Sequence, residues 1–261
     1  MARIQLDTAN TNAPDLVPYL LRVDPGGSAR DAQNLLRGWD FSQPADSAAA
    51  TYFNAVWRNL LRLTFTDDLS RTPAKATPSG GGRWFDVVRR MLANPDDPLW
   101  RNASDPRHLT RRDDVLRAAL QDADQELRDK LGKDPGSWRW GALHQLTLKN
   151  QTLGTGGPAP VQWLLNDGPY DVGGGSEAVD ATSWDAGAGY EVTMTPSMRM
   201  VVDLAHLDES RWINQSGASG HATSDTYADQ TELWLRGDTL PWAFSESVVA
   251  RTAAQKLELR P

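Results

Sequence analysis

The spacing of apolar residues changes along this chain, from a helical period before Pro135-Gly136 to an alternating period after it. Apolar residues at i, i+3, i+4 and i+7 lie on one face of a helix, whereas apolar residues that alternate lie on one face of a strand. The change predicts an α+β fold, with a mainly helical segment over residues 1–135 and a strand-rich segment with C-terminal helices over residues 136–261.

Three helices are predicted in the first half. The first begins near Asp46 or Ser47, either of which can cap it, and the second is centred near Val88. The third begins at Thr110, with Asp113 three residues later as in a capping box, and ends at a glycine. The apolar stripes are Phe53, Val56, Trp57, Leu60 and Leu61; Trp84, Val87, Val88, Met91 and Leu92; and Leu116, Ala119, Leu120, Ala123, Leu127 and Leu131, before Gly132. Segments 72–82 and 94–98 are predicted loops because they are rich in Gly, Pro and Asp.

The second half is predicted to hold short strands and glycine-rich loops. The strands are marked by Leu146 and Leu148, by Tyr190, Val192 and Met194, and by Leu257 and Leu259 at the end of the chain. Loops are expected at 154–158 and 173–175, and helices near 227–237 and 245–252.

The strand over residues 198–204 has the clearest alternation. One face carries Met198, Met200, Val202 and Leu204, and the other carries Arg199, Val201 and Asp203. We expect the methionine face to lie in the core.

Acidic and basic residues are mixed along the chain, which has 27 Lys and Arg, 34 Asp and Glu and a formal net charge of −7. No cluster of Lys or Arg could follow a phosphate backbone, so nucleic acid is not expected as a partner. No apolar run approaches the roughly 20 residues that span a bilayer, so no membrane partner is expected. The first residues also lack the apolar stretch of a signal peptide.

The chain has no cysteine, which excludes disulfides, thiolate metal sites and cysteine nucleophiles. Its 11 tryptophans are expected mainly as anchors of the core and of interfaces, with an aromatic ligand pocket as the alternative.

A metal site is the first alternative among the polar residues. Asp203, His206 and Asp208 offer suitable ligand atoms, but they follow a strand and enter a loop, so we favour a turn with solvated polar groups. Paired-histidine spacings such as HExxH are absent from the sequence.

A nucleophile and base could also be sought among the remaining histidines. His144 alternates with apolar neighbours and is interpreted as a structural histidine. Ser216 and His221 lie in a Gly-rich segment, where a turn is the better interpretation. Residues 173–175 are three glycines without the Lys-Ser/Thr of a phosphate loop, and we expect a tight loop at which chain segments approach closely.

A series of short segments, taken in order, carries a family resemblance. The segments are Gln5-Leu6-Asp7-Thr8 with Pro14 and Leu20-Leu21; Leu35-Leu36-Arg37-Gly38-Trp39-Asp40; Asp46-Ser47-Ala48-Ala49-Ala50; Trp138-Arg139-Trp140-Gly141 with Leu143-His144; Gly173-Gly174-Gly175-Ser176; Ser197-Met198-Arg199-Met200-Val201-Val202-Asp203-Leu204; Gln215-Ser216-Gly217-Ala218-Ser219-Gly220-His221; and Ser224, Tyr227, Asp229-Gln230 and Leu233-Trp234. Over nearly the whole chain they resemble the C-terminal part of the large (beta) subunit of the penicillin acylase (penicillin amidase) family. The chain departs from the family pattern at Thr226, Asp180 and Asn150-Gln151, which affects local loop contacts.

The resemblance implies a fold and a reaction. The fold would be the C-terminal portion of the αββα sandwich of N-terminal-nucleophile hydrolases, so that residues 1–135 and 136–261 together form one incomplete domain of a larger enzyme. The reaction would be hydrolysis of linear amides into acyl group and amine, on β-lactam, lipopeptide or acyl-homoserine lactone substrates, in antibiotic biosynthesis or degradation or in quorum quenching. The nucleophile would be a chain-terminal Ser that uses its own α-amino group as the base.

No residue of this chain matches that nucleophile. The family's Ser follows Gly and precedes Asn, whereas Gly27-Ser28, Gly136-Ser137 and Gly175-Ser176 precede Ala, Trp and Glu. The resemblance also puts the oxyanion Asn, its supporting Arg and the calcium-binding acids upstream of Gln5. We therefore predict no catalytic residue, no metal ligand and no cofactor in this chain, and we assign no substrate-binding residue.

The expected role is a framework that is inactive alone. Its partners would be the upstream part of the same large subunit, the small subunit of the heterodimer, and a small-molecule amide substrate. The intact family enzyme is periplasmic or secreted, and its signal would lie upstream. The alternatives are a standalone non-catalytic binding or scaffold protein, with tryptophans such as Trp39 and Trp163 in a recognition surface, and a metal hydrolase.

Overall fold

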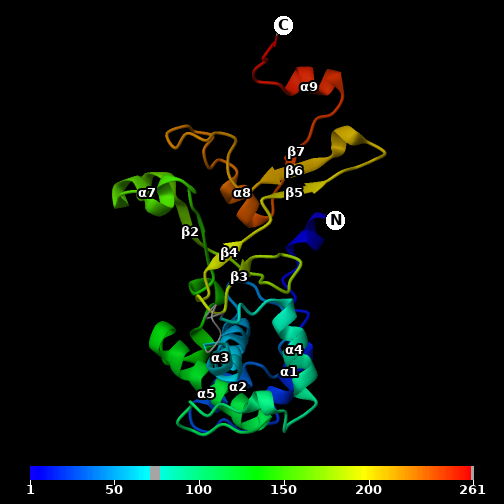
Figure 1. Ribbon diagram of the computed structural model, residues 1–261. Helices are drawn as coiled ribbons and strands as arrows, with labels where there is room; N and C mark the ends of the chain where they lie inside the picture. Colours follow the sequence, from blue (N-terminus) through cyan, green and yellow to red (C-terminus); the bar gives the residue numbers. More distant parts are fainter. Residues whose placement is uncertain (71–76, 260–261) are drawn as a thin grey trace. The chain divides into compact units, whose positions relative to one another are not determined.

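The computed structural model describes residues 1–70 and 77–259, and their contacts divide into two compact units. The helical unit contains residues 7–148 and 168–195, and the sheet unit contains residues 1–6, 149–167 and 196–261 (Figure 1). Each unit therefore takes residues from both sides of position 135. Part of the predicted loop at 72–82 lies outside the described residues.

Five α-helices lie in the described part of the helical unit. They are α1 (Ala13–Leu20), α2 (Ala29–Asn34), α3 (Ala48–Ser70), α4 (Gly82–Leu92) and α5 (Arg112–Leu131), with short 3₁₀ turns η2 (Pro98–Trp100), η3 (Pro135–Ser137) and η4 (Trp140–Ala142). In Figure 1, α3 lies among α2, α4 and α5. The core of the unit surrounds α3.

Helix α3 confirms the first predicted helix and is buried on more faces than the apolar stripe indicates. All five predicted stripe residues are at most 4% exposed, and Tyr52 and Ala55, which lie off that stripe, are 0% exposed. Tyr52 Oη donates to the carbonyl of Leu120 in α5 at 2.9 Å, so α5 covers a second face. Ser47 caps the helix, since its Oγ accepts a hydrogen bond from Ala50 N at 3.1 Å.

Helices α4 and α5 differ from the prediction at specific positions. In α4 the buried arc is centred on Phe85, Val88 and Leu92, so Val87 is 37% exposed. Helix α5 begins at Arg112, and Thr110 Oγ1 donates to the Asp114 carboxylate instead of capping the helix. The predicted capping box is therefore wrong. The predicted end of the helix is confirmed, because the C-cap Gly132 has φ 102°.

Two small sheets complete the helical unit. β1 (Gln145–Leu148) pairs with β2 (Asp167–Asp171), and β3 (Ser183–Trp184) pairs antiparallel with β4 (Val192–Met194). These confirm the strands predicted at Leu146 and Val192. The glycine loop before β3 is a close approach, as expected, because a Cβ on Gly173 would lie 2.7 Å from the carbonyl oxygen of Gln43.

The sheet unit contains an antiparallel sheet of strand order β5-β6-β7, formed by Met198–Val201, Arg211–Asn214 and Leu240–Pro241. Its helices are α6 (Leu153–Gly156), α7 (Ala159–Leu165), α8 (Thr231–Arg236) and α9 (Glu246–Thr252), with 3₁₀ turns η1 (Ala2–Leu6) and η5 (Leu207–Glu209). Helices α8 and α9 confirm the predicted C-terminal helices. Helix α6 replaces part of the predicted loop, α7 was not predicted, and the strand expected at Leu257 and Leu259 is wrong, because residues 253–259 form no strand.

The alternation of β5 is confirmed, but the face predicted to be buried is wrong. Met198 and Met200 are each 44% exposed, whereas Arg199 is 6% exposed. The Arg199 guanidinium lies 4.1 Å from the ring centroid of Trp234 in α8 and donates to the Trp234 carbonyl at 2.7 Å. A cation over an aromatic ring, with a carbonyl acceptor beside it, lets the arginine face pack inward. The methionine face is the uncovered face of the sheet unit.

Candidate functional site

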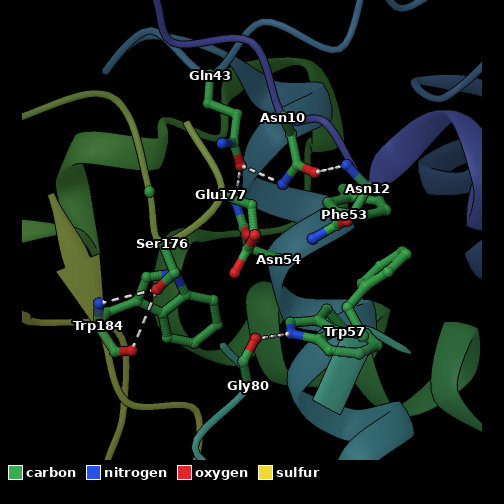
Figure 2. A pocket seen from close by; sticks show the side chains of 12 residues that line it. Asn10, Asn12, Gln43, Phe53, Asn54, Trp57, Gly80, Ser176, Glu177 and Trp184 are labelled. Carbon is green, nitrogen blue, oxygen red and sulfur yellow. Dashed lines mark hydrogen bonds between the residues drawn. The ribbon is translucent and has the colours of Figure 1, made fainter. Parts of the chain in front are cut away.

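One small pocket in the helical unit gathers buried polar side chains (Figure 2). We call it the polar pocket. Its volume is about 20 Å³, which is room for roughly one water molecule. It is lined by Asn10, Asn12, Gln43, Phe53, Asn54, Trp57, Gly80, Phe85, Gly175, Ser176, Glu177 and Trp184.

Hydrogen bonds fix how the amides of the polar pocket are oriented. Asn10 Oδ1 accepts from the backbone N–H groups of Asn12 and Ala13 at 2.9 Å, so its Nδ2 must face Gln43. Asn54 Nδ2 donates both to the carbonyl of Ala50 and to Gln43 Oε1, at 3.0 and 2.8 Å. Gln43 Oε1 therefore accepts from two amides, and its own Nε2 is left as a donor.

Glu177 is the only acid lining the polar pocket. Burial raises the pKa of Glu177 above its ordinary value, while the Asn12 side chain and the Gly82 N–H oppose this by stabilising the carboxylate. Figure 2 shows the Asn12 amide directed toward Glu177, although Asn12 Nδ2 makes no hydrogen bond of normal geometry. The neighbouring Ser176 Oγ bonds the backbone of Trp184, at 3.3 Å from its nitrogen. The pocket is thus arranged to hold a polar group, and its hydroxyl is turned toward the backbone.

The polar pocket was not predicted from the sequence. Three of its four amide side chains come from loops, and the fourth, Asn54, comes from the apolar stretch of α3. In the sequence, a single polar residue within such a stretch gives no sign of a pocket. The available signal was Asn54, which is 3% exposed and lies between the buried residues Phe53 and Ala55. A buried amide inside a helix needs acceptors, and these are what bring the other segments together.

His144 is fully buried and has the environment of a structural histidine. Its ring stacks on Trp140 with centroids 4.4 Å apart, and its Nδ1 lies 2.8 Å from the carbonyl oxygen of Tyr190. Nε2 lies 3.1 Å from Thr182 Oγ1, which also bonds the carbonyl of Gly173 at 2.6 Å. Burial lowers the pKa of His144 to about 4, so the ring is neutral at pH 7.

The residues that lie together as possible metal ligands differ from the set suggested by the sequence. Asp203 and His206 lie near Glu209, with their ligand atoms within 4.8 Å of one another. Asp208 is engaged elsewhere, because its Oδ1 accepts from the backbone N–H groups of Phe244 and Ser245 at 2.8 Å. A set that contains an imidazole does not suit calcium, which prefers six to eight oxygen ligands.

The segment with Ser216 and His221 is a turn, as interpreted. The N–H of Gly217 donates to the carbonyl of Tyr227 at 2.9 Å, and His221 Nδ1 lies 3.0 Å from Thr223 Oγ1. A Cβ on Gly217 would lie 1.9 Å from the Thr226 carbonyl oxygen, so the glycine is required by close packing. The imidazole is bonded within the loop.

The two tryptophans named for a recognition surface differ in exposure. Trp39 packs against Phe41 and Phe53, with centroid distances of 5.5 and 5.3 Å, and donates to the carbonyl of Ser42. Trp163 in α7 is 82% exposed. Most other indoles are anchors, with Trp100, Trp138, Trp140 and Trp234 at most 1% exposed. In the described residues, no helix is both long and apolar enough to cross a bilayer.

Comparison with solved structures identifies the fold. The thermostable penicillin G acylase from Alcaligenes faecalis, in its orthorhombic form, matches with a TM-score of 0.54 and 16% sequence identity, over 98% of this chain and 48% of that one. The mixed α and β architecture, with a helical first half and small sheets later, is therefore an arrangement found in that enzyme.

Comparison of sequences identifies the family. The penicillin amidase family model matches residues 1–251, and the chain belongs to this family of N-terminal-nucleophile hydrolases. It is 26% identical over 254 residues to acyl-homoserine lactone acylase QuiP from Pseudomonas aeruginosa, covering 89% of this chain and 29% of that protein. It is 31% identical over 272 residues to penicillin acylase 2 proenzyme from Pseudomonas sp. (strain SE83), covering 100% of this chain and 33% of that protein. The chain spans about a third of the length of these relatives, and the resemblance noted from the sequence is confirmed.

Proposed function

We propose that this chain is the C-terminal portion of the large subunit of a penicillin acylase-like amidohydrolase, which hydrolyses linear amides into an acyl group and an amine. The observation that carries the proposal is the family match over residues 1–251 together with relatives of which the chain covers about a third. Those relatives are an acyl-homoserine lactone acylase and a penicillin acylase.

The proposed role of the chain is framework. Amide hydrolysis by this class requires a Ser whose own α-amino group accepts the hydroxyl proton. In the described structure the side chains of Ser176 and His144 are bonded to backbone or to neighbouring structural residues. The nucleophile, the oxyanion donors and the calcium site would come from upstream residues, so the isolated chain is inactive and holds no cofactor.

The partners proposed are the upstream part of the large subunit and the small subunit. The methionine face of β5 supports this assignment, since Met198 and Met200 are each 44% exposed. Met200 lies opposite Trp212 of β6, so the uncovered face extends across two strands. Such a face would be covered by another layer in the αββα sandwich of the assembled enzyme.

The proposed substrates are small amides with an acyl group on one side. A suitable panel contains a phenylacetyl amide, an acyl-homoserine lactone and a lipopeptide, because these differ in the acyl group while keeping the scissile amide.

The test combines gene context with reconstitution. The coding sequence before Met1 is examined for a small subunit and a Ser-led segment, and the chain is then expressed alone and together with those segments. Hydrolysis of the panel only after co-expression supports the proposal. Hydrolysis at enzymatic rates by the chain alone, or reconstituted enzyme that is fully active without this chain, refutes it.

A binding or scaffold protein is the second candidate, and the exposed Trp163 is the observation that favours it. It predicts a saturable ligand whose affinity falls on Trp163→Ala, with no adjacent Ser-led coding segment.

A further inference from the structure

Gln43 presents a buried hydrogen-bond donor without a partner among the described residues. The side chain is 0% exposed, and its Nε2 has no acceptor. The amide cannot be reversed to relieve this, because Asn10 and Asn54 both direct N–H groups at Oε1. A buried donor left unpaired costs about 1–3 kcal/mol, so an acceptor at Nε2 is strongly favoured.

Gly175 leaves space beside this donor. A Cβ at Gly175 would lie 3.1 Å from Gln43 Nε2, and its φ is outside the range that requires glycine. The preceding Gly174 is different, because its φ is +81° and a Cβ there would lie 2.2 Å from the carbonyl oxygen of Asp180. The backbone conformation explains Gly174, whereas at Gly175 the absence of a side chain keeps the space next to Nε2 open.

The chemistry of the polar pocket restricts what can fill it. Gln43 Nε2 and Asn12 Nδ2 are both donors, so neither can bind a metal ion or an ammonium group. The Glu177 carboxylate disfavours an anion. A volume of about 20 Å³ admits one water molecule, which can accept from an amide and donate to a carboxylate or carbonyl.

We propose that the polar pocket is a binding site for one ordered water molecule that accepts a hydrogen bond from Gln43 Nε2. This water joins three segments that are distant in the sequence: the Asn10–Asn12 stretch, the Gln43 turn before α3, and the glycine loop that ends at Glu177. It accounts for the glycine at position 175, where neither the backbone conformation nor a backbone contact requires one. The inference is independent of the proposed catalytic function.

The test is detection of the water by NMR on the full chain. Cross peaks between water and the Gln43 side-chain amide are expected in NOE and ROE spectra, with opposite signs, which marks a long-lived contact and excludes proton exchange. The internal control is Asn59, whose Nδ2 donates to the carbonyl of Ala55 and to Glu126, at 3.0 and 2.9 Å. No water cross peak is expected at Asn59.

Two matched variants locate the water. Gly175→Ala places a methyl group against Nε2 and is expected to abolish the Gln43 cross peaks. Gly220→Ala adds the same group where nothing lies within 4 Å, and is expected to leave them unchanged. A folded wild-type chain without cross peaks at Gln43 overturns the proposal whatever the variants do. A crystal structure in which an ion or a protein atom contacts Nε2 overturns it as well.

Discussion

The neutral, buried His144 should make the helical unit lose stability as the pH falls. In the unfolded chain a histidine takes up a proton near pH 6.5, whereas burial lowers the pKa of His144 to about 4 in the folded chain. Between these values the unfolded state binds the proton and the folded state does not. Stability is therefore complete above pH 6.5 and decreases as the pH falls toward 4.

The size of the loss follows from the two pKa values. Each pH unit in this window costs about 1.4 kcal/mol, so the loss between pH 7 and pH 4 is about 3 kcal/mol. The ring is fully buried against Trp140, so solvent screening does not reduce this figure appreciably. A loss of 3 kcal/mol is a large part of the stability of a typical domain.

The assay compares the wild type with His144→Gln by urea unfolding at pH 7, 6, 5 and 4, followed by tryptophan fluorescence. The variant loses the stacked ring and is less stable at pH 7, but it has no imidazole to titrate at this position. The difference between the two proteins should shrink by about 3 kcal/mol from pH 7 to pH 4. A difference that stays constant, or grows as the pH falls, refutes the assignment of a neutral buried imidazole.

Three further predictions concern single positions. Ser47→Ala removes the bond to Ala50 N and should lower the free energy of unfolding of the helical unit by about 1 kcal/mol, measured by urea unfolding. Gly237→Ala should destabilise the sheet unit by about 1–2 kcal/mol, because φ is +75° and a Cβ would lie 2.2 Å from Leu6 Cδ1; thermal unfolding checks this. Met200→Glu should change stability by less than about 0.5 kcal/mol, yet prevent co-purification with the upstream segments.

Each of these has a matched control. Ser245 precedes α9, but its Oγ caps no helix N–H and lies 3.4 Å from Ser247 Oγ, so Ser245→Ala removes no cap and should cost less than Ser47→Ala. Equal losses at Ser47 and Ser245 would contradict the capping argument. Gly220→Ala is the control for Gly237→Ala, because it adds a Cβ at a position where nothing lies within 4 Å. Ile213 is 0% exposed on the opposite face of the sheet from Met200, so Ile213→Glu should unfold the sheet unit itself. Normal co-purification of Met200→Glu would remove the methionine face from the proposed interface.

Secondary structure was predicted best where a local feature of the sequence determines it. Helix α3 and the end of α5 at Gly132 follow from apolar spacing and from a residue that can adopt positive φ. Helix α7 was missed because its seven residues are too few to establish a period between two Gly- and Pro-rich stretches. The start of α5 was misplaced because Thr110 can bond either the backbone or a side chain, and it bonds Asp114.

The polar pocket could not be predicted because its parts are distant in the sequence. Asn10, Gln43 and Glu177 lie on loops whose approach depends on the glycines at 173–175 and on the buried amide of Asn54. The spacing of polar residues within each loop carries no information about the other loops. His144, by contrast, was interpreted correctly as structural, because its apolar neighbours on β1 and η4 indicated burial.

The strand β5 shows how a correct period can accompany a wrong prediction of burial. The alternation of apolar and polar residues shows that the two faces of β5 differ, but not which of them is buried. The apolar face was assigned to the core because burial of apolar area is favourable. Within the sheet unit the inner face is the one with Arg199, since Trp234 supplies both a ring and a carbonyl for the guanidinium. An exposed face with Met198 and Met200 is costly for a chain that functions alone, and it is reasonable for one layer of a larger enzyme. Under the proposed function, the apolar sequence of β5 serves the contact with the other segments and not the folding of this chain, and Met200→Glu tests that separation.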